Sequence, residues 1–162
     1  MERRTTAVLV AALALAGCGF QLRQAPTFAF ETIYVNAAPS SPLARELRRA
    51  LTSGGNVSLA AAPAAAGVIL DVLSEPREKV VVGLNATGQV REFQLRIRFR
   101  FKLRTSQGRE LIGESEILQQ RDISFTESAA LAKEAEEQLL YRDMQSEIVA
   151  QLLRRLAAVK AL

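Results

Sequence analysis

The sequence contains no histidine and only one cysteine, Cys18. Histidine is the usual general base near neutral pH, and histidine and cysteine are the usual zinc ligands, so most hydrolase and zinc-site templates are excluded. Carboxylate pairs such as Glu75 with Glu78, or Glu114 with Glu116, could in principle perform acid–base chemistry. They lie among many other charges, as solvated carboxylates do. The composition therefore predicts a binding or assembly protein and no enzyme, with no cofactor and no metal site.

The N-terminal apolar run, residues 7–16, is too short to cross a bilayer, which takes roughly 17 to 25 apolar residues. Two arginines precede the run, which is the pattern of an export signal. The segment Leu15-Ala16-Gly17-Cys18 that follows resembles the lipobox of bacterial lipoproteins. This resemblance implies that residues 1–17 are a signal peptide and that Cys18 is the lipidation site, anchoring the protein to a membrane. The alternative, a secreted protein with a stray thiol, leaves an unpaired cysteine in an oxidising compartment.

The remaining chain suits one domain. Residues 18–28 are rich in polar and helix-breaking side chains and predict a lipidated tether, and residues 29–162 then form a single α+β domain. Loss of residues 1–17 removes two arginines and one glutamate, which changes the formal net charge from +4 to +3. For an exported basic protein this charge points to anionic lipid or glycolipid as the partner and not to nucleic acid.

Hydrophobic periodicity predicts the order strand, helix, several strands, helix. Strict alternation of apolar and charged residues over residues 92–104 predicts a long half-buried strand, which returns after a turn at residues 106–108 through residues 111–125, with Gly113 as a bulge. Shorter strands are expected at residues 32–36 and 68–74, residues 57–60 could form another short strand, and residues 80–82 continue the β character before a loop at 83–88.

Two helices are expected. The first begins at Pro42 with Ser41 as its N-cap and stops at Gly54-Gly55, and the second follows Thr126 as its cap, or a capping box of Ser124 with Glu127. The last helix carries an apolar stripe at spacing four, formed by Leu140, Met144, Ile148, Leu152 and Leu156. The predicted fold is an α+β two-layer sandwich, a mostly antiparallel or mixed sheet of four to five strands packed on two helices.

The polar face of the long strand is a row of cations. Its members, called here the basic row, are Arg96, Arg98, Arg100, Lys102 and Arg104. Successive members lie about 6.6 Å apart, so the row could bind several phosphates. The sequence also allows cross-strand ion pairs, because an even register would place Glu110, Glu114 and Glu116 opposite Arg104, Arg100 and Arg98. Both interpretations stay open at this point.

Read in order, short segments of the chain resemble the family of LPS-assembly lipoproteins called LptE or RlpB. The matching segments are Cys18-Gly19-Phe20-Gln21-Leu22-Arg23, Leu43-Ala44-Arg45-Glu46-Leu47, Gly88-Gln89, Glu92-Phe93-Gln94, Arg121-Asp122, Ala130-Leu131-Ala132-Lys133, Arg142-Asp143-Met144 and Gln151-Leu152-Leu153-Arg154-Arg155-Leu156. Together they keep the family's order and spacing over nearly the whole mature chain.

The resemblance implies a non-catalytic outer-membrane lipoprotein that faces the periplasm, plugs and stabilises the LptD β-barrel, and binds lipopolysaccharide during its insertion into the outer leaflet. It also implies that Lys133 contacts lipopolysaccharide. At the family's other basic position, before a turn, this chain has Ala86, and Arg91 is the candidate replacement. With Arg96, Arg98 and Arg100, these residues are the lipopolysaccharide-binding candidates. A pilot or scaffold lipoprotein of another envelope assembly machine is the alternative.

Overall fold

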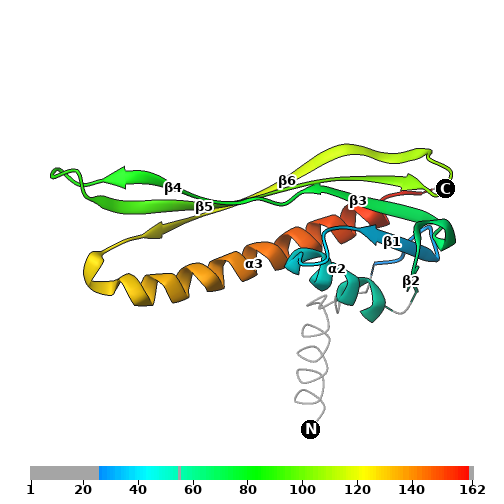
Figure 1. Ribbon diagram of the computed structural model, residues 1–162, viewed down its shortest axis with the longest axis horizontal. Helices are drawn as coiled ribbons and strands as arrows, with labels where there is room; N and C mark the ends of the chain where they lie inside the picture. Colours follow the sequence, from blue (N-terminus) through cyan, green and yellow to red (C-terminus); the bar gives the residue numbers. More distant parts are fainter. Residues whose placement is uncertain (1–25, 55, 161–162) are drawn as a thin grey trace, which may run out of the picture.

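Two α-helices pack on one face of a six-stranded sheet in the computed structural model, which describes residues 26–54 and 56–160 (Figure 1). The elements in chain order are β1 (Thr32–Asn36), α2 (Pro42–Ser53), β2 (Ser58–Leu59), the 3-10 helix η1 (Pro63–Ala65), β3 (Val68–Ser74), β4 (Arg77–Leu84), β5 (Val90–Thr105), β6 (Glu110–Ser124), the 3-10 helix η2 (Glu127–Ala129) and α3 (Ala130–Ala157). The predicted α+β sandwich is confirmed, with one strand more than expected. The predicted signal peptide, the predicted lipidation site Cys18 and most of the predicted tether lie outside the described residues.

Strand β5 is the axis of the sheet. On one side it pairs with β6 in an antiparallel hairpin over nearly its whole length. On the other side it pairs with β3 along its C-terminal half and with β4 along its N-terminal half, both antiparallel. Strand β1 continues the sheet by pairing parallel with β3, and β2 pairs parallel with β1. The molecule is therefore long, with β1, β2, β3 and α2 at one end and the β4–β5 turn at the other (Figure 1).

A proline separates β3 from β4 along the same edge of β5. Pro76 has no backbone N–H to give to a ladder, so the strand cannot continue unbroken through it. Its carbonyl still accepts a hydrogen bond of 3.2 Å from the backbone N–H of Arg98. The ladder on β5 thus passes from β3 to β4 with only a local interruption.

The apolar face of β5 and the stripe of α3 form the core. Leu95, Phe99, Phe101 and Leu103 have no measurable exposure, as the strict alternation predicted. The helical side of this core is formed by the buried residues Tyr141, Met144, Ile148, Val149, Leu152 and Leu156. Burial of each large apolar side chain contributes roughly 1.5 to 3 kcal/mol to stability, so this interface holds α3 in place on the sheet.

Helix α2 begins where the sequence predicted. The Ser41 hydroxyl accepts a hydrogen bond of 2.9 Å from the backbone N–H of Ala44, and Pro42 occupies the first turn, where its missing N–H costs nothing. Gly54 closes the helix. The apolar face of α2, which includes Leu47 and Leu51, is buried in the core.

Two boundaries differ from the prediction. Thr126 makes no side-chain capping bond, because residues 127–129 form a 3-10 turn and α3 begins only at Ala130. Gly83 and Leu84 belong to β4 and not to a loop, since both still pair with β5. The turn that remains is held by the Asn85 side chain, whose Oδ1 accepts hydrogen bonds from two following backbone N–H groups.

The irregularity expected at Gly113 is present. Phe101 lies opposite Ser115 whereas Leu103 lies opposite Ile112, so β6 carries one extra residue at Gly113–Glu114; a second extra residue, Leu111, follows because Arg104 lies opposite Glu110. Such a bulge re-aims the side chains on its strand. In residues 26–54 and 56–160, no helix is both long enough and apolar enough to span a membrane.

Candidate functional site

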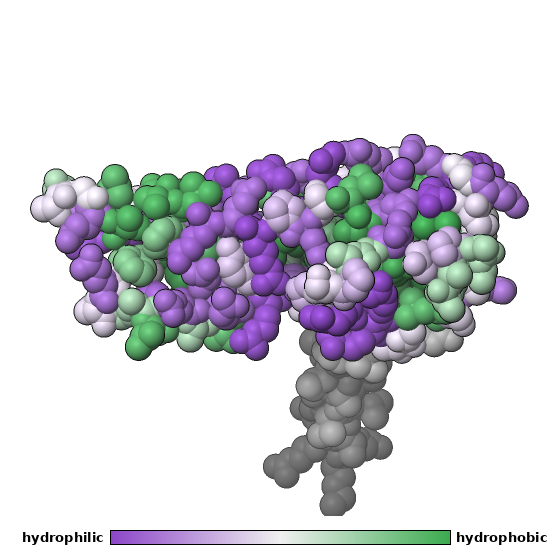
Figure 2. Space-filling view, in the orientation of Figure 1, coloured by the Kyte–Doolittle hydropathy of each residue, from purple (hydrophilic) through white to green (hydrophobic). Residues whose placement is uncertain are grey.

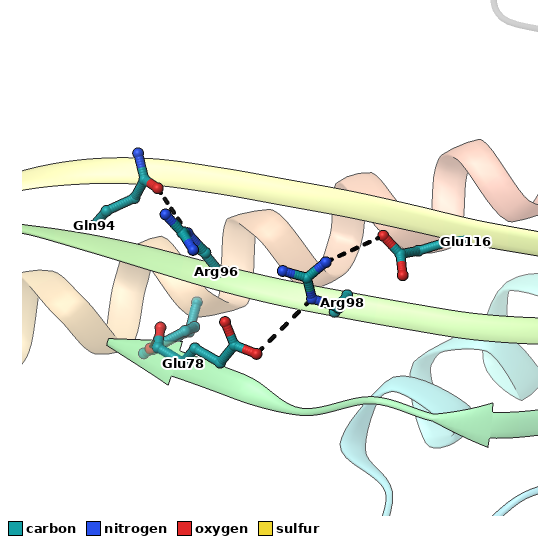
Figure 3. A network of polar contacts seen from close by, with 6 residues as sticks. Glu78, Gln94, Arg96, Arg98 and Glu116 are labelled. Carbon is teal, nitrogen blue, oxygen red and sulfur yellow. Dashed lines mark hydrogen bonds and ion pairs between the residues drawn. The ribbon is translucent and has the colours of Figure 1, made fainter. Parts of the chain in front are cut away.

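The basic row lies on the face of the sheet opposite the helices. Even-numbered residues of β5 alternate with the buried odd-numbered residues, so all five cations share one side, as predicted. Neither helix of the described chain covers this side. Figure 3 shows Arg96 and Arg98 on it, with Glu78 of β4 and Glu116 of β6 on either side and Gln94 beside Arg96 on β5 itself.

Three members of the row are ion-paired. Arg98 lies 3.8 Å from a carboxylate oxygen of Glu78 and 3.6 Å from one of Glu116 (Figure 3), and Arg100 pairs with Glu114. Two one-residue irregularities in β6, one at Gly113–Glu114 and one at Leu111, together shift the register by two residues, so that Arg100 lies opposite Glu116 and Arg98 opposite Leu118. The arginine side chains are long enough to reach diagonally to the carboxylates that the even register would have placed opposite them.

The third pair differs from the prediction. Arg104 does lie opposite Glu110 in the ladder, but its Nε donates to Asp71 on β3 at 2.7 Å. Asp71 is the better acceptor because its side chain is only 9% exposed, so water competes less for its hydrogen bonds. The predicted ion pair between Arg104 and Glu110 is therefore wrong.

Asp71 accepts a second hydrogen bond of 2.7 Å from the Asn36 amide of β1. Burial alone would raise the pKa of Asp71. The hydrogen bonds from Arg104 and Asn36 and the charges of Arg104 and Lys102 outweigh it and hold the pKa below the ordinary value of 3.8. The same bond to Asp71 raises the pKa of Arg104. Asp71 thus joins β1, β3 and β5, and sequence reasoning missed it because its partners lie more than thirty residues away.

Two members of the row, Arg96 and Lys102, make no ion pair with any residue that the structure describes. Arg96 instead donates from Nε to the amide oxygen of Gln94 at 2.7 Å (Figure 3). Exposed apolar side chains stand diagonally beside Arg96 on the same face, Val80 at 37% and Leu118 at 38% exposure. This part of the sheet therefore offers a cation next to apolar surface.

Apolar exposure increases toward the far end of β4. Val81 and Val82 are nearly half exposed, and Leu84 is 61% exposed. Figure 2 shows apolar residues gathered at this end of the molecule, whereas the middle of the visible face is mostly hydrophilic. Exposed apolar patches of this kind mark surfaces for partners or ligands.

Lys133 lies on the other side of the sheet, where α3 begins. Its ammonium group donates to the Ser124 hydroxyl at 3.1 Å and to Glu136 at 2.8 Å. It borders a cavity of about 260 Å³ whose walls include Phe93 and Phe125. The site therefore combines an ammonium group with aromatic walls.

Lys79 of β4 borders the same cavity. Its ammonium group lies 4.4 Å from the centre of the Phe93 ring and 2.6 Å from Glu137 of α3. Sequence reasoning missed Lys79, although its alternation with Val80 and Val82 places it on the helix side of β4.

Arg91 lies at the same end of the molecule. It lines a second hollow of about 320 Å³ together with Thr126 and Glu127, next in the chain to the Phe125 wall of the first. Arg91 shares the odd parity of Phe93 and so the helix side of β5. The structure therefore groups Arg91 with Lys133, and it places Arg96, Arg98 and Arg100 on the opposite face.

Comparisons with known proteins agree on one family. Residues 30–156 match the family model described as LptE, lipopolysaccharide-assembly. The chain is 28% identical over 166 residues to the LPS-assembly lipoprotein LptE of Photorhabdus laumondii, covering 98% of this chain and 88% of that protein.

Two solved structures share the fold. The solution structure of an uncharacterized lipoprotein B from Nitrosomonas europaea has a TM-score of 0.76 at 33% identity, covering 86% of this chain and 91% of that one. The crystal structure of the rare lipoprotein B from Shewanella oneidensis has a TM-score of 0.67 at 25% identity, covering 79% and 95%. The matched region includes the whole sheet and nearly all of α3, and on these grounds the chain belongs to the LptE family of lipopolysaccharide-assembly lipoproteins.

Proposed function

We propose that this protein is anchored in the outer membrane through lipid on Cys18, plugs and stabilises the LptD β-barrel, and binds lipopolysaccharide during its insertion into the outer leaflet. Family membership supports a role in lipopolysaccharide assembly. The observation that carries ligand binding is the unpaired cation Arg96 beside exposed Val80 and Leu118. Lipid A presents phosphates next to acyl chains, and this surface complements both.

The first test addresses the barrel. The full acylated protein, affinity-tagged and solubilised in mild detergent, should co-purify with LptD in a stable complex. Recovery with a different envelope machine and no LptD would favour the pilot or scaffold role. Photocrosslinking from positions on β4 and β5, compared with positions on the exposed side of α2, would then show which surface faces the barrel wall.

The second test addresses the basic row. Arg96→Ala should weaken lipopolysaccharide binding about fivefold, since an exposed charge contact contributes up to about 1 kcal/mol. Arg100→Ala should have a smaller effect, because Arg100 is already paired with Glu114. The double variant with Arg96→Glu and Arg100→Glu should bind most weakly, and its remaining binding should depend less on salt.

Arg45→Glu on exposed α2 is the matched control for charge reversal. It should leave lipopolysaccharide affinity unchanged. Loss of thermal stability in the Arg96 and Arg100 variants with unchanged affinity would instead mean that the row serves only to hold the strands together.

The third test separates the two faces. Lys133→Glu and Arg91→Glu should each reduce lipopolysaccharide binding while the circular dichroism spectrum stays native, because both side chains border hollows and neither is in the core. If only the variants at Arg96 lose affinity, the ligand occupies the open sheet face alone. If neither face responds, lipopolysaccharide binding by these residues is rejected.

A further inference from the structure

The cavity beside Lys133 lies between the start of α3 and the neighbouring ends of β4, β5 and β6 (Figure 1). Helix α3 contributes one face, which includes Lys133 and Glu137, about one turn apart. The sheet side contributes Lys79 of β4 and the rings of Phe93 and Phe125. The two rings meet edge to face with their centroids 5.3 Å apart. Two ammonium groups and an aromatic wall therefore border one space.

The two lysines differ in where their carboxylate partners lie. Lys133 pairs at 2.8 Å with Glu136, whose side chain is 48% exposed and lies outside the cavity wall. Lys79 pairs at 2.6 Å with Glu137, which lines the cavity and is only 16% exposed. The Glu137 carboxylate therefore occupies the position beside Lys79 that the anionic group of a ligand would take.

The charges of the cavity cancel in this state. Glu134 also lines it, so the wall carries two lysines and two glutamates. An anion can reach the Lys79 ammonium group only when the Glu137 side chain turns away. Rotation about the side-chain torsions of a glutamate allows this, because the torsions have several staggered minima and the carboxylate can move into water. The ion pair thus competes directly with an anionic ligand.

The size and the lining of the cavity define the ligand. Its volume of about 260 Å³ is slightly below the roughly 300 to 1,000 Å³ of typical small-molecule sites. It therefore has room for one small ring with an attached anion and not for several acyl chains. A bare phosphate would leave the aromatic wall uncovered, whereas an acyl chain would leave the ammonium groups without a partner. A sugar phosphate satisfies both parts of the lining.

We propose that this cavity binds the phosphorylated sugar of an anionic glycolipid, with Lys79 and Lys133 on its phosphate, and that Glu137 competes with the ligand for Lys79. The inference rests on the proposed binding of lipopolysaccharide and identifies the part of that ligand which the helix side of the sheet recognises. Lys79 then determines specificity, and Glu137 lowers the affinity by holding Lys79 in the unliganded protein.

Glu137→Gln separates this role from that of a simple tie between β4 and α3. The amide keeps the shape of the side chain but removes the competing charge, so the full acylated protein in mild detergent should bind lipopolysaccharide about two- to fivefold more tightly. A simple tie predicts unchanged or lower affinity. Glu147→Gln is the matched control, because Glu147 lies on the same helix and pairs with Arg121 at 2.6 Å outside the cavity. It should leave the affinity unchanged.

Lys79→Met tests the cation itself. It keeps the apolar stem and removes the charge, so lipopolysaccharide affinity should fall about fivefold, and Lys79→Arg should restore most of it. Circular dichroism and the melting temperature check that each variant is folded. The gain expected for Glu137→Gln cannot arise from unfolding, so the proposal stays testable even if Lys79→Met does not fold.

Soluble probes identify the ligand class. In calorimetry with the natural protein, glucosamine 1-phosphate should bind at least about fivefold more tightly than inorganic phosphate, because its ring covers the aromatic wall. Glu137→Gln should tighten its binding further. Equal affinity for the two probes would overturn the assignment of a sugar phosphate.

The variants also distinguish this inference from the proposed function. Lipopolysaccharide binding that responds to Arg96→Ala but to neither Lys79→Met nor Glu137→Gln would overturn the inference and leave the proposed function intact. An equal gain in Glu137→Gln and Glu147→Gln would also overturn it, since the effect would then reflect net charge alone. Absence of any lipopolysaccharide binding by the natural protein would overturn both.

Discussion

Substitution of the buried Asp71 tests how much its hydrogen bonds stabilise the face of the sheet that carries the basic row. Its side chain is 9% exposed and accepts hydrogen bonds from Arg104 and Asn36, both of 2.7 Å. A hydrogen bond to a charged group contributes about 1.5 to 3 kcal/mol net. Asp71→Ala removes both bonds but leaves Arg104 partly open to water, so we expect the free energy of unfolding to fall by about 2 to 3 kcal/mol.

Glu116→Ala is the matched control on the same face. The Glu116 carboxylate lies 3.6 Å from Arg98, and its side chain is 40% exposed. Its removal should cost less than about 0.5 kcal/mol. Urea unfolding at pH 7, followed by circular dichroism, compares the two variants by their midpoints at constant slope.

The pH dependence follows from the lowered pKa of Asp71. A carboxyl group with a depressed pKa stabilises the folded state fully above its unfolded pKa, and this contribution is lost as the pH falls through the folded pKa. The difference between the natural protein and Asp71→Ala should therefore be constant from neutral pH down to about 5 and shrink once the pH falls below the ordinary value of 3.8. The reasoning is refuted if Asp71→Ala destabilises no more than Glu116→Ala, or if the difference persists unchanged in acid.

Three further substitutions test packing, a turn and a cap. Leu152→Ala should lower the free energy of unfolding by about 2 to 5 kcal/mol in urea, because a fully buried side chain leaves a cavity; a loss below about 1 kcal/mol would mean that α3 does not pack as described. Gly108→Ala should cost about 1 to 2 kcal/mol in the same assay, because this glycine has a φ of +94° in the β5–β6 turn and L residues are strained there. Ser41→Ala should cost about 1 kcal/mol in thermal unfolding, since it removes the N-cap bond to Ala44 and the hydrogen bond to Glu75, and Ser41→Asn, which can still cap the helix, should cost less.

Elements with a strong local pattern were predictable from the sequence. The alternation along residues 92–104 predicted β5, its buried face and the basic row, because one face of this strand packs on helices and the other meets water. Ser41-Pro42 predicted the start of α2, because helix capping depends on residues adjacent in the sequence. The position of the β6 bulge followed from Gly113.

Features decided by distant residues were not predictable. Nothing local indicates that β3 and β4 share one edge of β5, or that two irregularities in β6 together move its register by two residues. The choice of Asp71 over Glu110 as the partner of Arg104 depends on which strand is the neighbour and how deeply each carboxylate is buried. The separation of Lys133 from the basic row follows from which face the helices cover.

The pairing of β1 with β3 has a consequence for the order in which the chain assembles. Strands β4, β5 and β6 are joined by short turns and pair antiparallel, so they can form as soon as residues 77–124 are available. Strand β1 finds a stable neighbour only in β3, across a connection that contains α2, and β3 in turn is fixed by β5. Strand β1, the first strand of the described residues, is therefore expected to join the sheet late, after β3 has paired with the β4–β5–β6 unit.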